Sequence, residues 1–217
     1  MGKAYYPMFA DLEGRRCVVI GGGVVAQRKV TMLLRCGARV TVVSPDITNR
    51  LSAYAKQGRI QHISRRARPT DVRGAWLVYA ATDDQRINEQ VYRTATQLRI
   101  FTNVVDQKPL CSFIAPAIFT RGSLTIAVST GGASPSLSKT IRDELAQRVG
   151  TEYVPLLRLL GALRPIAKRR LPEYRDRKRY FDQLVKGRVV DLIRAGKRRE
   201  ARAEALSLLA RSSRNGH

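Results

Sequence analysis

The chain has 217 residues, with 40 Lys and Arg against 17 Asp and Glu, so its formal net charge is +23. This length forms one large domain or two small ones, and an apolar share of 44% argues against wholesale disorder. No apolar run approaches the roughly 20 residues that a membrane-spanning helix needs. The start of the chain lacks the apolar core of a secretory signal, and Tyr6 does not fit a myristoylation signal beginning at Met1-Gly2. Three scattered cysteines without a C-x-x-C pair favour a reducing cytoplasm over a disulfide scaffold or a zinc site: Cys17, Cys36 and Cys111.

Most of the positive charge is arginine, with 31 Arg and only 9 Lys, and the isoelectric point is about 11.1. A basic chain of this kind usually binds nucleic acid or an anionic membrane surface. The guanidinium group also matches carboxylate or phosphate oxygens two at a time, so a small polycarboxylate is another candidate partner. General solubility explains much of the excess equally well.

The first half of the chain alternates short apolar runs with longer amphipathic stretches. The amphipathic stretches have helical spacing and end at glycine or polar residues. Apolar runs that are buried on both faces, separated by helices, predict an α/β fold with a doubly wound parallel sheet. The strands of this sheet are expected at Cys17–Ile20, Arg39–Val43, Ile60–Ile63, Trp76–Ala80 and Ile100–Val104.

The pattern changes after Ser112. Two apolar runs, Phe113–Ile118 and Leu124–Val128, flank the turn signal Arg121-Gly122 and predict an antiparallel hairpin. A helix is expected from Ser134-Pro135 to about Arg148, and the remainder is helical, with breaks near Pro165, Pro172 and Gly187. We therefore expect three parts: a sheet domain over 1–112, a small α+β segment over 113–148 and a basic helical domain over 149–217.

A glycine-rich loop follows the first strand. Gly21-Gly22-Gly23-Val24-Val25-Ala26 fits the G-x-G-x-x-A pattern, between a buried strand and a helix. Gly21 permits a tight turn, Gly23 lets a pyrophosphate approach the backbone, and Ala26 lets the helix pack closely on the sheet. The loop predicts a Rossmann-like dinucleotide site at the helix N-terminus, although a glycine-rich turn that binds nothing has the same sequence.

The end of the second strand reads Val43-Ser44-Pro45-Asp46. An acid at this end usually binds the adenosine ribose of NAD. Here Ser44 occupies the position where this acid is expected, and the first acid, Asp46, follows two residues later. The residues alone do not decide between NAD and NADP.

Five blocks of sequence occur in an order that resembles the precorrin-2 dehydrogenase family, the N-terminal module of siroheme synthases. The resemblance covers about residues 5–150, and the tail resembles the family only in being helical. Five blocks in order are far more specific than any one block. They are Gly21 to Lys29, Ala80 to Asp84, Asn103 to Asp106, Ser112 to Ala117 and Ser129 to Pro135.

The resemblance implies an NAD-dependent oxidation of precorrin-2 to sirohydrochlorin, on the route to siroheme, in a cytoplasmic homodimer that uses the segment 113–148 for dimerisation. Asp106 matches the aspartate proposed as catalytic in the family. Some relatives carry a modifiable serine where this chain has Thr130, beside Ser129. Some relatives also insert iron into sirohydrochlorin, and this sequence offers no firm sign of that activity.

The expected site residues fall into three groups. Asp106 follows a strand end and is either a general base or a common turn former. Ser129, Thr130 and Gly131 precede a helix N-terminus, where they either bind a substrate carboxylate or belong to a plain N-cap. The expected cofactor set is Gly21, Gly22, Gly23, Val24, Val25, Ser44, Pro45, Asp46, Ala81, Thr82, Asn103 and Val104.

No metal-ligand constellation is visible, because His62 and the last residue, His217, are isolated and the cysteines are scattered. Asp83 and Asp84 are adjacent carboxylates at a helix start, where capping is the more common role.

Two other classes of protein fit parts of the sequence. A nucleotide-sensing regulatory domain explains the glycine loop but leaves Asp106 and the arginines without a role. A nucleic-acid-binding protein is suggested by the basic clusters Lys168–Arg170 and Arg175–Arg179. These clusters lie among apolar residues at helical spacing, and Tyr174, Tyr180 and Phe181 are too few for base stacking. We therefore expect a tetrapyrrole polycarboxylate as partner, and neither nucleic acid nor a membrane.

Overall fold

The computed structural model describes residues 4–214, so the expectations on Met1-Gly2 and His217 lie outside the described residues. Its contacts divide the chain into two compact units. The first contains the residues up to Ala115 together with Gly131–Ala133, and the second contains Pro116–Thr130 and the chain from Ser134 onward. The three-part division at residues 112 and 148 stays a prediction.

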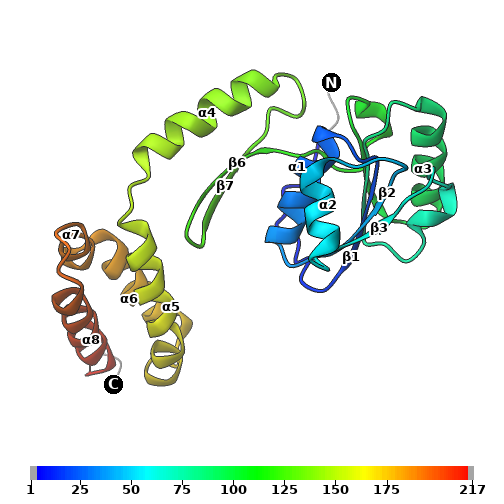
Figure 1. Ribbon diagram of the computed structural model, residues 1–217. Helices are drawn as coiled ribbons and strands as arrows, with labels where there is room; N and C mark the ends of the chain where they lie inside the picture. Colours follow the sequence, from blue (N-terminus) through cyan, green and yellow to red (C-terminus); the bar gives the residue numbers. More distant parts are fainter. Residues whose placement is uncertain (1–3, 215–217) are drawn as a thin grey trace. The chain divides into compact units, whose positions relative to one another are not determined.

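The first unit is built on a five-stranded parallel sheet with the order β3-β2-β1-β4-β5 (Figure 1). The chain adds strands on one side of β1 and then returns to add β4 on the other side. This reversal confirms the doubly wound arrangement and creates a switch point between β1 and β4, where such sheets bind ligands. The strands are β1 (Arg16–Ile20), β2 (Arg39–Val43), β3 (Ile60–Ile63), β4 (Leu77–Ala80) and β5 (Phe101–Val104).

Helices cover both faces of this sheet, with α1 (Val24–Arg35) and α2 (Asn49–Lys56) on one face and α3 (Gln85–Gln97) on the other (Figure 1). Residues 17–20 of the central strand are fully buried because its alternate side chains enter two cores. Val19 belongs to the same core as Val30 of α1, and Val18 to the same core as Val91 of α3. This two-sided burial explains why the strand reads as a continuous apolar run.

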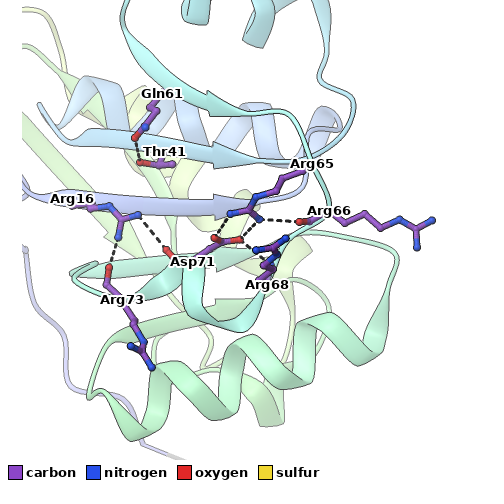
Figure 2. Close-up of polar contacts among 8 residues, drawn as sticks. All are labelled: Arg16, Thr41, Gln61, Arg65, Arg66, Arg68, Asp71 and Arg73. Carbon is purple, nitrogen blue, oxygen red and sulfur yellow. Dashed lines mark hydrogen bonds and ion pairs between the residues drawn. The ribbon is translucent and has the colours of Figure 1, made fainter.

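An arginine–aspartate cluster fixes the connection between β3 and β4, which includes the short 3-10 helix η1 (Pro69–Val72) (Figure 2). The Arg65 guanidinium donates two hydrogen bonds to the Asp71 carboxylate, at 2.6 and 2.9 Å, and the Arg68 backbone N–H donates a third at 2.8 Å. Arg16, the first residue of β1, donates to the Asp71 carbonyl at 3.2 Å. The bond from Arg65 is the largest cause that lowers the pKa of Asp71.

The second unit begins with an antiparallel hairpin and continues as helices. The core of its helical part lies among the last four helices, where the buried Tyr180 hydroxyl donates to the Ala205 carbonyl at 3.0 Å. Within residues 4–214, no helix is both long and apolar enough to cross a membrane. The elements are β6 (Ala117–Arg121), β7 (Leu124–Val128), α4 (Pro135–Arg148), α5 (Tyr153–Arg170), α6 (Tyr174–Lys186), α7 (Arg188–Arg194) and α8 (Arg198–Arg214).

The starts of β1, β4 and β5 differ from the sequence expectations by one residue, and two elements differ by more. The hairpin begins at Ala117 because Phe113 instead packs edge-on against Tyr79 of the first unit, with ring centroids 5.5 Å apart. Pro165 does not end α5, because Leu163 and Ala167 on either side of it are buried and hold the helix in place. The expected breaks at Pro172 and Gly187 do separate helices.

We predict that Asp71→Asn lowers the free energy of unfolding of the first unit by about 1–3 kcal/mol, because the variant loses charge-assisted hydrogen bonds. Since the folded-state pKa of Asp71 is lowered, its contribution is present above the unfolded value near 4 and is lost as the pH falls through the folded value. The wild type should therefore lose more stability than the variant between about pH 5 and pH 3.

Urea unfolding followed by the fluorescence of Trp76, the single tryptophan, measures this unit. Glu89→Gln is the control, because Glu89 forms only an exposed ion pair with Arg93 at 3.7 Å, a type that contributes little. Equal acid sensitivity of wild type and Asp71→Asn would contradict the prediction.

Candidate active site

The backbone of the glycine loop lies directly against the ends of the two strands that flank β1. A Cβ atom on Gly21 would lie 2.2 Å from the Ala81 carbonyl oxygen, and the Gly21 φ of +109° is itself unfavourable for other residues. A Cβ atom on Gly22 would lie 1.9 Å from the Asp46 carbonyl oxygen. A Cβ atom on Gly23 would meet nothing within 4 Å among the described residues. The loop is therefore closed on two sides and open at Gly23.

The open side coincides with the start of α1. Gly23 is the N-cap residue, and within the described chain no side chain caps this end and no acid lies in the first turn. The first backbone N–H groups of the helix can therefore donate to an anion. Val24 and Val25 are 57% and 41% exposed and offer apolar surface beside it. This combination fits the pyrophosphate of a dinucleotide.

The segment after β2 lies beside the glycine loop. The Thr48 N–H donates to the Gly22 carbonyl at 3.0 Å, and the Thr48 hydroxyl donates to the Gln27 side chain at 2.7 Å. Ser44 is buried, whereas Pro45 and Asp46 are exposed. The residues available to an adenosine ribose are therefore Pro45 and Asp46.

The opposite side of the loop is formed by the residues after β4. Asp84 caps α3 by accepting a hydrogen bond from the Ile87 N–H at 3.2 Å, which confirms the capping interpretation for this residue. Thr82 is tied to the same helix, because its carbonyl accepts from the Asn88 side chain at 2.9 Å. Ala81, like Thr82, is only partly buried.

Asp106 lies on a tight turn immediately after β5. Its φ of +59° is a left-handed conformation, which Asp tolerates better than most residues. The buried Cys111 thiol donates to the carbonyls of Val104 and Gln107, at 3.2 and 3.3 Å, and so joins the two ends of the turn. The Asp106 carboxylate is exposed and has no hydrogen bond or ion pair to any residue within 4–214. Asp106 is thus a turn residue whose carboxylate is free for chemistry.

Asn103 and Val104 have structural contacts in this region. Both are buried in the last part of β5, and the Asn103 side chain donates to the Phe113 carbonyl at 3.0 Å. This bond holds the segment after the 3-10 helix η2 (Lys108–Leu110) against the sheet.

The second glycine pair lies against the Asp106 loop within the first unit. Gly131 and Gly132 have φ values of +63° and +79°, and a Cβ atom on Gly132 would lie 3.3 Å from the Lys108 side chain. The Lys108 ammonium is also close to Gly132, since its Nζ atom would lie 3.4 Å from the same Cβ atom. Neither Lys108 nor Cys111 has a sequence signal for these contacts, since their partners are identified only by the folded structure.

The neighbouring hydroxyls belong to the start of α4. The Thr130 hydroxyl accepts from the Ser134 N–H at 3.0 Å and lies 3.0 Å from the Ser138 hydroxyl. Ser134 caps the helix by accepting from the Leu137 N–H at 3.2 Å. These bonds agree with the N-cap interpretation, and a substrate role for Ser129, Thr130 and Gly131 stays a prediction.

The basic clusters of the tail lie on helix surfaces. Lys168–Arg170 and most of Arg175–Arg179 are exposed, whereas Tyr180 is fully buried and unavailable for stacking on a base. This arrangement favours a solvated helix face. In the part of the chain that the structure describes, no three His, Cys, Asp or Glu side chains are grouped as a metal site would need.

The fold and the loop define a nicotinamide-dinucleotide-binding protein of the Rossmann type, and a family model for NAD(P)-binding domains matches residues 8–117. Two further family models match the rest of the chain. The central region of siroheme biosynthesis proteins matches residues 121–148, and the dimerisation region of siroheme synthases matches residues 152–209. The chain belongs to the siroheme synthase and precorrin-2 dehydrogenase family.

Individual relatives agree with this assignment. The siroheme synthase of Thioalkalivibrio sulfidiphilus is 39% identical over 91% of this chain and 40% of its own length. That of Nitrosospira multiformis is 38% identical over 92% of this chain and 43% of its own. The chain therefore spans about two-fifths of these relatives. The solved structure of a precorrin-2 dehydrogenase is 26% identical, with a TM-score of 0.76, and matches over 94% of this chain and 100% of that one.

We predict that Gly23→Val folds normally but binds NAD at least about tenfold more weakly, because the new side chain fills the approach of the pyrophosphate. Gly22→Ala should instead lower stability by roughly 1–3 kcal/mol, because its Cβ meets the Asp46 backbone. Calorimetric titration with NAD and thermal unfolding separate the two effects. NAD affinity within twofold of wild type in Gly23→Val would show that the loop does not hold the pyrophosphate.

Proposed function

We propose that the chain oxidises precorrin-2 to sirohydrochlorin, with NAD as the hydride acceptor, in a cytoplasmic homodimer. The observation that carries this proposal is the free Asp106 carboxylate, which lies at the same edge of the sheet as the open glycine loop. A general base beside a dinucleotide site is what the removal of a hydride and a proton requires.

The hydrogen bonds between strands bring these groups to one edge. The Ala81 N–H donates to the Ile20 carbonyl at 2.8 Å, and the Val105 N–H donates to the Ala80 carbonyl at 2.9 Å. The ends of β1, β4 and β5 are therefore level, with the glycine loop after the first and Asp106 after the third. Parallel sheets place their ligands at this edge.

The proposed oxidation has two parts, the transfer of a hydride to NAD and the removal of a proton, and the residues of the candidate site suit both. When bound, NAD supplies a nicotinamide ring that accepts a hydride, which carries two electrons. The substrate also gives up one proton, and the unpaired Asp106 carboxylate is positioned to accept it. Asp46 supports NAD over NADP, because its exposed carboxylate beside the ribose position would repel a 2′-phosphate.

The proposed partners follow from charge and from family membership. A polycarboxylate tetrapyrrole suits an arginine-rich surface, since guanidinium groups bind carboxylates in pairs. The homodimer is supported by the match to the dimerisation region, which covers residues 152–209 rather than the segment 113–148 that we expected to dimerise.

Anaerobic absorbance assays with precorrin-2 and either NAD or NADP test substrate and cofactor together. Formation of sirohydrochlorin is the expected result. A nucleotide sensor would bind the dinucleotide without reducing it, and this outcome would overturn the proposal. Adding ferrous or cobaltous ion afterwards tests whether the chain also inserts a metal ion into its product.

We predict that Asp106→Asn lowers kcat by ~10²–10⁴-fold, the usual contribution of a general base, while NAD and tetrapyrrole affinities change little. Asn also tolerates the left-handed backbone of this turn, so the variant should fold. Steady-state kinetics and a binding titration with sirohydrochlorin measure the two quantities. Turnover at the wild-type rate would leave Asp106 as a turn residue only.

We also predict that the apparent KM for the tetrapyrrole rises steeply with salt, whereas the KM for NAD rises weakly and kcat changes little. The Debye length falls from ~10 Å at 0.1 M salt to ~3 Å at 1 M, so long-range attraction of a polyanion fades over this interval. NAD is held mainly by backbone N–H groups and carries fewer charges. If both constants move together, or neither moves, the basic surface does not capture the substrate.

A further inference from the structure

A half-buried ammonium group lies on the β4 side of the glycine loop, outside the set of expected site residues. Lys29 is on α1, and its Nζ atom lies 5.0 Å from the centre of the Tyr79 ring on β4. Helical side chains lean toward the helix N-terminus, which here is the end at the glycine loop. The long Lys29 side chain therefore extends back toward the ligand-binding edge of the sheet.

The charge on Lys29 is not neutralised by the protein. Among residues 4–214, no carboxylate lies within ion-pair distance of it, and Tyr79 beneath it stays neutral because burial raises the pKa of its phenol to about 12. Burial is also the main influence on Lys29 and lowers its pKa. Cationic groups that leave water normally have an anionic partner.

The charged and titratable groups around Lys29 come from α1, from β4, which carries Tyr79, and from the segment after β5. Arg28, on the same helix, lowers the pKa of Lys29, whereas Asp106 and Cys111, which follow β5, raise it. Asp106 is the larger of the two raising influences although it forms no ion pair with Lys29. Lys29 is thus within electrostatic reach of the proposed base but beyond ion-pair distance from it.

The position of Lys29 in the sheet order indicates which ligand supplies the missing anion. The adenosine end of a dinucleotide extends from the glycine loop toward β2, where Pro45 and Asp46 are exposed. Lys29 lies on the other side of β1, over β4, where the nicotinamide end would be. The N–H groups at the start of α1 account for the pyrophosphate of NAD. Since oxidised nicotinamide is a cation with a neutral carboxamide, the anion that fits Lys29 is one from the second ligand.

We propose that Lys29 binds one carboxylate of the tetrapyrrole substrate. This inference rests on the proposed function and adds a specific anchor to it. An anchor of this kind holds substrate and product alike, so it lowers KM more than it raises kcat.

The test uses Lys29→Met, which keeps the length and apolar stem of the side chain but removes its charge. Sirohydrochlorin affinity, followed by absorbance, should be roughly 10- to 100-fold weaker, the cost of losing a hydrogen bond to a charged group. The KM for precorrin-2 should rise to a similar extent, with kcat within about threefold and NAD affinity within about twofold. Lys29→Arg, which keeps the charge, should recover much of the affinity.

Lys56→Met is the matched control, because it removes the same charge from the exposed last turn of α2 in the same unit. The pH dependence of tetrapyrrole affinity distinguishes a charged role of Lys29 from a purely structural one. Tetrapyrrole affinity of the wild type should fall as the pH rises through the Lys29 pKa, whereas that of Lys29→Met should lack this step. Circular dichroism confirms that each variant is folded.

Three results would overturn the inference while the wild type still oxidises precorrin-2. They are unchanged tetrapyrrole affinity in Lys29→Met, an equal loss in Lys56→Met, and a loss of NAD affinity as large as that of the tetrapyrrole. A wild-type chain that neither binds sirohydrochlorin nor oxidises precorrin-2 overturns the proposed function itself, and the anchor with it.

Discussion

The close approach of three backbone segments at Gly21 and Gly22 is the constraint on which the site depends. The loop after β1 passes between the carbonyls of Ala81 and Asp46 with no space for a side chain on either side. Because the loop is confined in this way, the start of α1 is fixed relative to the ends of β2 and β4. The open direction at Gly23 and the position of Lys29 on α1 both follow from that placement.

Polar groups are used differently in two parts of the first unit. In the connection from β3 to β4, Arg16 and Arg65 donate to Asp71 and stabilise the chain between the two strands (Figure 2). At the candidate site, the Asp106 carboxylate and the Lys29 ammonium have no partner of opposite charge at ion-pair distance among the described residues. A fold that pairs its charges in a structural connection and leaves them unpaired at the candidate site keeps binding capacity there.

Much of the fold could be predicted because its signals are local. Buried β-branched runs identified all five parallel strands, and Asp84 was identifiable as a cap from its place before a helix. The misplaced hairpin start and the uninterrupted α5 have tertiary causes, since Phe113 packs on Tyr79 and the neighbours of Pro165 are buried. Propensity cannot anticipate such contacts.

Residues of the candidate site could be predicted only where they belong to a recognisable sequence motif. Gly23 and Asp106 belong to recognisable blocks, whereas the space at Gly23 and the freedom of the carboxylate are properties of the folded chain. Lys29 lies within the first block, yet its importance depends on a phenol ring 50 positions away in sequence and on a loop further still. Pairwise distances of this kind are not encoded in any local pattern.

The left-handed backbone at Asp106 limits which side chains can occupy this position. Short polar residues such as Asp and Asn adopt this conformation at modest cost, whereas longer and β-branched residues do so less readily. Glu has the same acid group as Asp but one more methylene and a weaker tolerance for the turn. The chemistry open to this edge of the sheet is therefore limited by the shape of the main chain as well as by the acidity of the group.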